Sequence, residues 1–506
     1  MHQLMMVYLP QEELKRVSNM SQNSRVGFSR PLKTVFLATL LLSSLYAESI
    51  DDVMDGFDDA PSTTVSPASS ALDVADEIMD GFEDEPTIKE NILLKEEVSN
   101  ANKSLIQIPK KLVKTKSFNS SGVTGKLTEQ VAFSYRDDKP HDNISSLKTS
   151  LLLDYEHKFD NGFKVKTNAK AYYDAIYGIK GKERYSQDER DELESEVELY
   201  DAYVEGSLSD NLDIKLGRQV VVWGRSDTIR VTDVLNPLDN RRPGMVDIED
   251  LRLPVAMAKL DYFVGDWRVT PMAVLEQRFS KNPPFGSAFN PSPRTTPNNK
   301  HYNDITPALS VGGEFSGWDV NFYAAELHDD AGYAEAGIQK HDKVKMLGSA
   351  VNILSGSWLL KSELAYFDGV KYSSTQDKEF KRTEGLLGVE YNGIANTLIS
   401  YDVALKKINA YDDRLKNEPM GLEKENYQHA FRVSSDFMNA TIKANYLISL
   451  FGENADKGGF QRAWMKYDIA DGIFANVGLV DYIGGSKRFD AVSNNDMAFM
   501  DITYSF

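Results

Sequence analysis

The sequence predicts an all-β fold, a transmembrane antiparallel β-barrel of about eighteen strands (range about 16 to 18), preceded by an acidic N-terminal leader. Three observations lead to this fold class. Apolar and polar residues alternate along many short segments, the links between these segments are short and long in turn, and the chain ends on an aromatic residue after an alternating segment.

The last ten residues, MAFMDITYSF, show the alternation clearly. One face would carry Ala498, Met500, Ile502, Tyr504 and Phe506, and the other face the residues between them. The segment FKVKTNAKAYY at 163–173 repeats the pattern, with lysines on its polar face. A soluble sandwich and a membrane barrel both produce this period, so alternation alone predicts strands but no location.

The lengths of the links favour a membrane barrel. Links rich in Asn, Asp and Gly, as hairpin turns require, alternate with much longer ones, which is typical of short turns on one rim and long loops on the other. An even number of strands then places both chain ends on the short-turn, periplasmic side. The predicted short links are Asp160-Asn161-Gly162, Ser209-Asp210-Asn211, Val264-Gly265-Asp266, Ser316-Gly317, Ser355-Gly356-Ser357, Asn392-Gly393, Met438-Asn439 and Ala470-Asp471-Gly472.

Aromatic residues support this arrangement. Trp267, Trp318 and Trp358 each follow a short link and share the apolar face of their segments, as an interfacial girdle requires. The terminal Phe506, with Tyr504, resembles the C-terminal signal of bacterial outer-membrane barrels. We therefore expect outer-membrane lipid and the barrel-assembly machinery as partners of the last strand.

The N-terminal 47 residues read as a signal peptide. Basic residues precede the apolar run TVFLATLLLSSL at 34–45, and the run ends near Ala47, the expected cleavage point. A run of this length is shorter than the roughly twenty residues that span a bilayer as a helix. The predicted localisation is the outer membrane of a Gram-negative bacterium, with the barrel over residues 117–506.

Residues 48–116 form an acidic periplasmic leader that we expect to be mostly disordered, with a short amphipathic helix near residues 88–98. Two DGF-type repeats, DDVMDGFDD at 51–59 and DEIMDGFED at 76–84, stand out within it. One interpretation is a pair of partner-docking motifs; the other is an acidic solvating linker. The docking residues would be Met54, Phe57, Met79 and Phe82.

The polar face of the barrel predicts a wet lumen, because unpaired charges without water would be costly. Both signs occur on the predicted lumen wall, which includes Lys164, Lys166, Lys170, Lys215, Arg268, Glu276, Arg432, Asp436, Lys443, Arg462 and Lys466. The net charge of the whole chain is −19, which makes nucleic acid an improbable partner.

The longest loop, residues 223–254, is expected on the outer side between the fifth and sixth strands. Its charges and three prolines suit a loop that folds inward and narrows the pore. The alternatives are a solvated surface loop and a purely structural tether. The predicted constriction residues are Arg225, Asp227, Arg230, Asp233, Asp239, Arg241, Arg242, Asp247, Asp250 and Arg252.

This same region, GRQVVVWGRSDTIRVTDVLNPLDNRRPG followed by RLPVAMAKLDYFVGDW, resembles the signature of an uncharacterised bacterial outer-membrane β-barrel family, the domain of unknown function 1302 group. The resemblance extends over most of residues 120–506. It implies a barrel whose relatives occur with a periplasmic carrier and an inner-membrane exporter, and hence movement of hydrophobic cargo. The resemblance carries over no catalytic residue.

The leading functional prediction is an outer-membrane channel or transport component with a polar lumen narrowed by the 223–254 loop. A structural or adhesive barrel is the alternative, followed by an outer-membrane hydrolase, for which His328-Asp329-Asp330 and His141-Asp142 are the best candidates. With no cysteine, seven scattered histidines and none of the common motifs, the sequence predicts no enzyme, no catalytic residue, no metal site and no cofactor.

Overall fold

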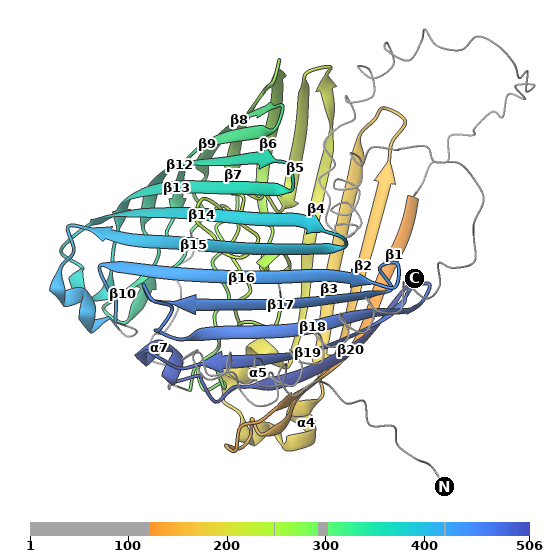
Figure 1. The fold of residues 1–506 in the computed structure, drawn as a ribbon, viewed down its shortest axis with the longest axis vertical. Coiled ribbons are helices and arrows are strands. Elements are labelled where there is room, and N and C mark those ends of the chain that lie inside the picture. Colours follow the sequence, from red (N-terminus) through yellow and green to blue (C-terminus); the bar gives the residue numbers. More distant parts are fainter. Residues whose placement is uncertain (1–120, 247, 292–301, 419–420) are drawn as a thin grey trace, which may run out of the picture. The chain divides into compact units, whose positions relative to one another are not determined.

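A computed structural model describes residues 121–246, 248–291, 302–418 and 421–506. The described residues form a sheet of eighteen antiparallel strands, in which each strand pairs with the next along the chain and β1 pairs with β20, so that the sheet closes into a barrel (Figure 1). The strands are β1 (Ser121–Ser134), β2 (Asn143–Lys158), β3 (Lys164–Asp174), β4 (Ser195–Ser209), β5 (Leu212–Gln219), β6 (Val255–Val264), β7 (Trp267–Val274), β8 (Thr306–Phe315), β9 (Trp318–His328), β12 (Lys343–Ser355), β13 (Trp358–Val370), β14 (Phe380–Ile394), β15 (Thr397–Asn409), β16 (Glu425–Phe437), β17 (Ile442–Phe451), β18 (Gly459–Ala470), β19 (Ile473–Ile483) and β20 (Met497–Ser505).

The predicted strand number and the alternation of short and long links are confirmed. Seven of the eight predicted short links lie at or within the turns that join the strands. The prediction for Asn392-Gly393 is wrong, because both residues lie inside β14 and the turn falls at Ala395-Asn396. Asn396 adopts φ 54°, a left-handed conformation that Asn tolerates well, and this allows the turn three residues later in the chain.

Large apolar side chains point outward, as a surface facing lipid requires. On β20, Met500, Ile502 and Tyr504 are exposed, whereas Asp501 and Thr503 between them are buried on the inner face. Trp267, Trp318 and Trp358 are the first residues of β7, β9 and β13, directly after short turns, and all three are exposed. The predicted aromatic girdle therefore lies on the short-turn rim.

The long loops, which leave the strands at the opposite rim, contain the short helices. These are α4 (Ile176–Lys180), η2 (Lys182–Arg184), α5 (Gln187–Leu193), α6 (Ile248–Leu251), η3 (Ser373–Thr375), η4 (Asp413–Asn417) and α7 (Lys487–Asp490), with a small hairpin of β10 (Tyr333–Glu335) and β11 (Ile338–Lys340). Across the described ranges, no helix is long and apolar enough to cross a membrane.

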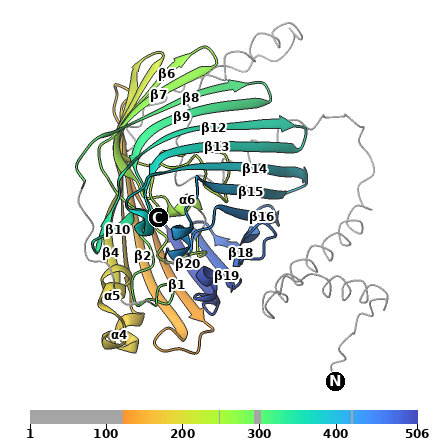
Figure 2. The same ribbon diagram turned by 90° about the vertical axis from the view of Figure 1, so that its left-hand side faces the viewer.

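The loop between β5 and β6, residues 220–254, folds into the barrel, and Figure 2 shows its helix α6 inside the ring of strands. Its apolar side chains pack against the inner faces of β6–β9 and β12–β15 to form the larger hydrophobic core of the molecule. Loop residues in this core are Val221, Trp223, Ile229, Val231 and Leu235. Burying each such side chain contributes about 1.5–3 kcal/mol, so the loop is a packed part of the fold.

Candidate functional site: the inward loop and the lumen

One end of the inward loop is bound to the wall formed by β9, β13 and β15. The carboxylate of Glu363 on β13 accepts hydrogen bonds from the backbone N–H groups of Arg225 (2.6 Å), Ser226 (3.0 Å) and Thr232 (3.0 Å), and from the Thr232 hydroxyl (2.7 Å). Glu363 is only 3% exposed, so the loop replaces the water that this carboxylate would otherwise require.

Further wall contacts surround Glu363. Asp402 on β15 accepts hydrogen bonds from the hydroxyls of Ser226 (2.7 Å) and Thr228 (2.6 Å). Two of the predicted constriction residues make ion pairs here: Arg225 with Asp319 of β9, and Asp227 with Lys361 of β13 at 3.3 Å. The first third of the loop is thus fixed to one side of the lumen.

The opposite extremity of the loop in space, formed by residues 242–244, contacts the wall across the lumen. Arg242 donates to Asp174 of β3 and Ser146 of β2, each at 2.9 Å, and Asp174 is fully buried. The carbonyls of Pro243 and Gly244 accept from Tyr482 of β19 and Arg462 of β18. Because β2 and β3 lie on the far side of the ring from β13, the loop spans the lumen.

Contacts within the loop keep its two stems together. Asn236 accepts from the backbone N–H of Val221 (2.8 Å) and donates to the carbonyls of Gln219 (3.3 Å) and Leu253 (2.9 Å). Asp233 accepts ion pairs from Arg230 at 3.0 Å and Arg252 at 2.9 Å. These predicted constriction residues therefore shape the loop itself.

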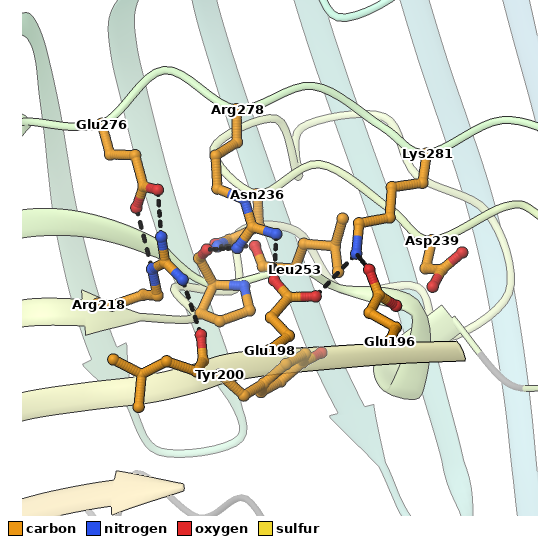
Figure 3. Close-up of polar contacts among 12 residues, drawn as sticks. Glu196, Glu198, Tyr200, Arg218, Asn236, Asp239, Leu253, Glu276, Arg278 and Lys281 are labelled. Carbon is orange, nitrogen blue, oxygen red and sulfur yellow. Dashed lines mark hydrogen bonds and ion pairs between the residues drawn. The ribbon is translucent and has the colours of Figure 1, made fainter. Parts of the chain in front are cut away.

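A second loop, between β7 and β8, pairs with carboxylates of β4 (Figure 3). Lys281 lies 2.6 Å from Glu196 and 2.7 Å from Glu198, and Arg278 pairs with Glu198. From the inward loop, Arg241 pairs with the same Glu196 at 2.7 Å and with Asp239 at 2.5 Å. The β4 carboxylates therefore form ion pairs with both loops.

A cavity of about 320 Å³ lies between the inward loop and the strands beside it. Its lining mixes apolar and charged side chains, with Val231 and Asp233 from the loop and Phe367, Arg382 and Glu384 from the wall. Glu276, a predicted wall residue just after β7, also lines it and pairs with Arg218 as shown in Figure 3.

The other predicted wall residues lie on strands. Lys164, Lys166 and Lys170 are on β3, Lys215 on β5, Arg268 on β7, Arg432 and Asp436 on β16, Lys443 on β17, and Arg462 and Lys466 on β18. Of the remaining predicted residues and segments, Asp250 lies in α6, whereas Asp247, Met54, Phe57, Met79 and Phe82, the signal peptide and the leader lie outside the described residues.

The two histidine pairs singled out in the sequence link loops. His328 bonds to Asp304 (3.0 Å) and to the carbonyl of His341 (2.5 Å), and His141 bonds to Glu189 of α5 (3.0 Å). The hydrogen bonds from Lys343 and His328 lower the pKa of Asp304 to about 2, although burial opposes this shift. Over the described ranges, no three His, Cys, Asp or Glu side chains are placed to hold a metal ion.

These features define a transmembrane β-barrel whose lumen is crossed by one of its own long loops. The chain belongs to the family of proteins of unknown function DUF1302, whose model matches residues 133–506. The inward loop lies wholly within the matched region.

Comparison with solved structures finds outer-membrane barrels. OccK9 (OpdG) of Pseudomonas aeruginosa aligns with a TM-score of 0.48 and 10% identity over 76% of this chain and 98% of its own. OccK8 (OprE) of the same organism gives 0.45 and 11% over 76% and 98%, and the outer membrane channel DcaP of Acinetobacter baumannii gives 0.41 and 10% over 76% and 97%. Curated proteins gave no match. Identities this low carry no substrate or gating property across to this chain.

Proposed function

We propose that the protein is an outer-membrane channel, or the channel part of a transport system, in which the 220–254 loop restricts passage through a polar lumen. One observation carries this proposal: the loop crosses the lumen and bonds to opposite walls, to Glu363 on one side and to Asp174 on the other. A barrel that served only as a scaffold or adhesin would have no need to hold a loop across its interior.

The lumen suits polar solutes while the loop is in place. The apolar wall patch that would suit a hydrophobic cargo includes Met257, Met272 and Val274, and all three are buried beneath loop residues. Hydrophobic cargo, which the family resemblance implies, would therefore require the loop to leave this wall. The same proposal places the chain in the outer membrane, assembled through its last strand, with its acidic leader meeting a periplasmic carrier or exporter.

Single-channel recording in planar bilayers tests the proposal. The chain has no cysteine, so a Met245→Cys/Val480→Cys pair can be cross-linked without side reactions. Met245 of the loop and Val480 of β19 belong to one buried cluster, and bridging them holds the far end of the loop against its wall.

We expect discrete conductance from the unmodified protein, a lower conductance after cross-linking with a reversible dithiol reagent, and recovery on reduction. The single variants Met245→Cys and Val480→Cys, treated in the same way, are the controls. Absence of current from correctly folded protein would contradict the channel, and a conductance unaffected by the bridge would contradict the role of the loop.

A further inference from the structure

The cavity of about 320 Å³ beside the inward loop lies at the long-loop end of the lumen. Its lining includes His328 at the end of β9 and Arg382 near the start of β14, and the long links of the barrel leave the strands there. The volume is at the lower end of the range of about 300–1,000 Å³ that small-molecule sites occupy. The cavity is therefore large enough for a small solute.

Apolar side chains form one part of the lining. Val234 of the inward loop and Leu327 of β9 are only partly buried, and both pack against the larger core. Phe367 of β13 also lines the cavity, and its ring centre lies 4.4 Å from the guanidinium carbon of Arg382. An apolar part of a solute gains free energy by burial against these side chains, whereas its charged groups need partners.

Most charged residues of the lining already have such partners within the protein. Glu276 and Arg278 each form an ion pair with a residue outside the lining, as Figure 3 shows. Arg230 and Asp233 of the inward loop pair with each other at 3.0 Å. These four residues therefore leave little charge for a solute.

The carboxylate of Asp329 is different. Within the described residues it makes no hydrogen bond and no ion pair, whereas the neighbouring Asp330 accepts from the backbone N–H (2.7 Å) and the hydroxyl (2.6 Å) of Ser280. The Asp329 carbonyl accepts from Nδ1 of His341 at 2.8 Å, which fixes the backbone. Burial raises the pKa of the Asp329 carboxyl, and the charge of Arg382 opposes this shift. A bound cation would supply the partner that this carboxylate lacks.

Two cations lie near Asp329. Arg382 on β14 and Lys406 on β15 are the positive charges that act most strongly on it, yet within the part of the chain that the structure describes neither is within ion-pair distance of it. Both cations share one carboxylate, Glu384, which lies 2.6 Å from Arg382 and 3.3 Å from Lys406. The cavity wall therefore presents an unpaired carboxylate and a surplus cation close together.

We propose that this cavity binds a small zwitterion of the α-amino acid class with an apolar side chain, its ammonium group at Asp329 and its carboxylate at Arg382 and Lys406. An α-amino acid carries both charged groups on one carbon, which matches charges of opposite sign that are close but not in contact. Such a ligand needs no net charge on the wall, because it brings one charge of each sign. As a step in transport, this inference rests on the proposed channel function, whereas binding itself does not.

Competition for bound radiolabelled L-leucine, measured by equilibrium dialysis of the detergent-solubilised protein, tests the site. Leucinamide lacks the carboxylate and 4-methylpentanoate lacks the ammonium group, so each keeps the apolar side chain and one charged contact. We expect unlabelled leucine to compete at concentrations about tenfold lower than either analogue. The absence of saturable leucine binding, or equal competition by all three compounds, would overturn the proposal.

Two variants separate the charged contacts. Asp329→Asn should weaken leucine and leucinamide about tenfold, and 4-methylpentanoate not at all. Lys406→Gln should weaken leucine and 4-methylpentanoate about threefold, because the Lys406 side chain is half exposed, and should leave leucinamide unchanged.

Asp471→Asn and Lys345→Gln are the matched controls, because they remove exposed charges outside the cavity lining. Both should bind leucine as the unmodified protein does. Equal losses of all three compounds in Asp329→Asn or in Lys406→Gln would contradict the assignment of the charged groups.

Binding and current separate this inference from the channel proposal. Leucine binding that depends on Asp329, in a protein that carries no current, would support the site and contradict the channel. Current through a protein that binds no leucine would support the channel and overturn the site.

Discussion

The two ends of the inward loop are held in different ways. At the Glu363 end, the wall supplies a buried carboxylate and the loop supplies its own backbone N–H and hydroxyl groups. At the Arg242 end, the loop supplies a guanidinium to Asp174, a wall carboxylate that also accepts from Ser146 and from the backbone N–H of Leu147. At the Glu363 end, one wall residue therefore makes several of the contacts that hold the loop. At the Arg242 end, Asp174 binds a single loop side chain.

The Glu363 end of the loop also buries more apolar side chains than the Arg242 end. Five buried side chains of the first half of the loop join the larger core, whereas Met245 represents the loop in the smaller cluster with Val480, Tyr482 and Phe499. Stability is not uniform across a structure, and regions with fewer buried contacts open first. The comparison indicates that the loop releases from the Arg242 wall while the Glu363 end remains in place.

The largest expected effect is that of Glu363→Gln. Both carboxylate oxygens accept from loop donors, so an amide N–H₂ group must face at least one N–H or hydroxyl donor and leave buried groups unsatisfied. We expect the loop to be destabilised by about 2–4 kcal/mol. Trypsin cleavage after Arg225 and Arg230, which the folded loop protects, should accelerate strongly.

Glu314→Gln on β8 is the matched control, because it removes a carboxylate at an exposed strand position. Equal cleavage rates for Glu363→Gln, Glu314→Gln and the unmodified protein would show that Glu363 does not hold the loop.

Arg242→Gln should have a smaller effect. Asp174 keeps the hydrogen bonds from Ser146 (2.6 Å), Leu147 (2.8 Å) and Ile176 (3.2 Å), so its carboxylate is not left unsatisfied. We expect a loss of about 1.5–3 kcal/mol, the contribution of a charged hydrogen bond. Thiol labelling of Met245→Cys should become several-fold faster in the Arg242→Gln background, and labelling of Ser226→Cys should not.

Asp402→Asn should have a smaller effect still. Within the described residues, Asp402 accepts hydrogen bonds from the hydroxyls of Ser226 and Thr228, both at Oδ2, and an asparagine oxygen can accept the same bonds. We expect less than about 1 kcal/mol by the same trypsin assay. A loss as large as that of Glu363→Gln would contradict the distinction between neutral hydroxyl donors and the backbone donors on Glu363.

The smallest effect concerns pH at Asp304, between the second loop and β12. Its pKa is lowered from its ordinary value of 3.8 to about 2, so its pairing with Lys343 and His328 stabilises the fold above about pH 4. This stabilisation is lost as the pH falls from about 4 through 2. Asp304→Asn should melt slightly below the unmodified protein at pH 7 and by a much smaller margin at pH 2.

The sequence predicted the barrel well because its signals are local. Alternation of apolar and polar residues is read within one strand, and turn residues such as Asp471-Gly472 are read within one link. The single misplaced turn, Asn392-Gly393, shows the limit of such local signals. Both Asn392-Gly393 and the nearby Asn396 tolerate a left-handed backbone, and pairing with β15 decided which of them forms the turn.

The site was harder to predict because its partners are distant in the chain. The charges of the 223–254 loop were identified, but Glu363, Asp402 and Asp174, which bind it, follow the ordinary alternation of their strands and give no separate signal. Only the ring closure brings residues 130 or more positions apart, such as Arg225 and Glu363, into contact. The apolar residues Val231 and Leu235 inside a charged loop were the available clue that it is packed and not solvated.

The most direct measurement compares two reversible cross-links in single-channel recordings. One joins Met245→Cys to Val480→Cys at the Arg242 end, and the other joins Ser226→Cys to Asp402→Cys at the Glu363 end. We expect the first bridge to lower the conductance until it is reduced, and the second to leave it nearly unchanged. A larger loss from the second bridge, or no loss from either, would contradict a loop that restricts the lumen and opens from the Arg242 wall.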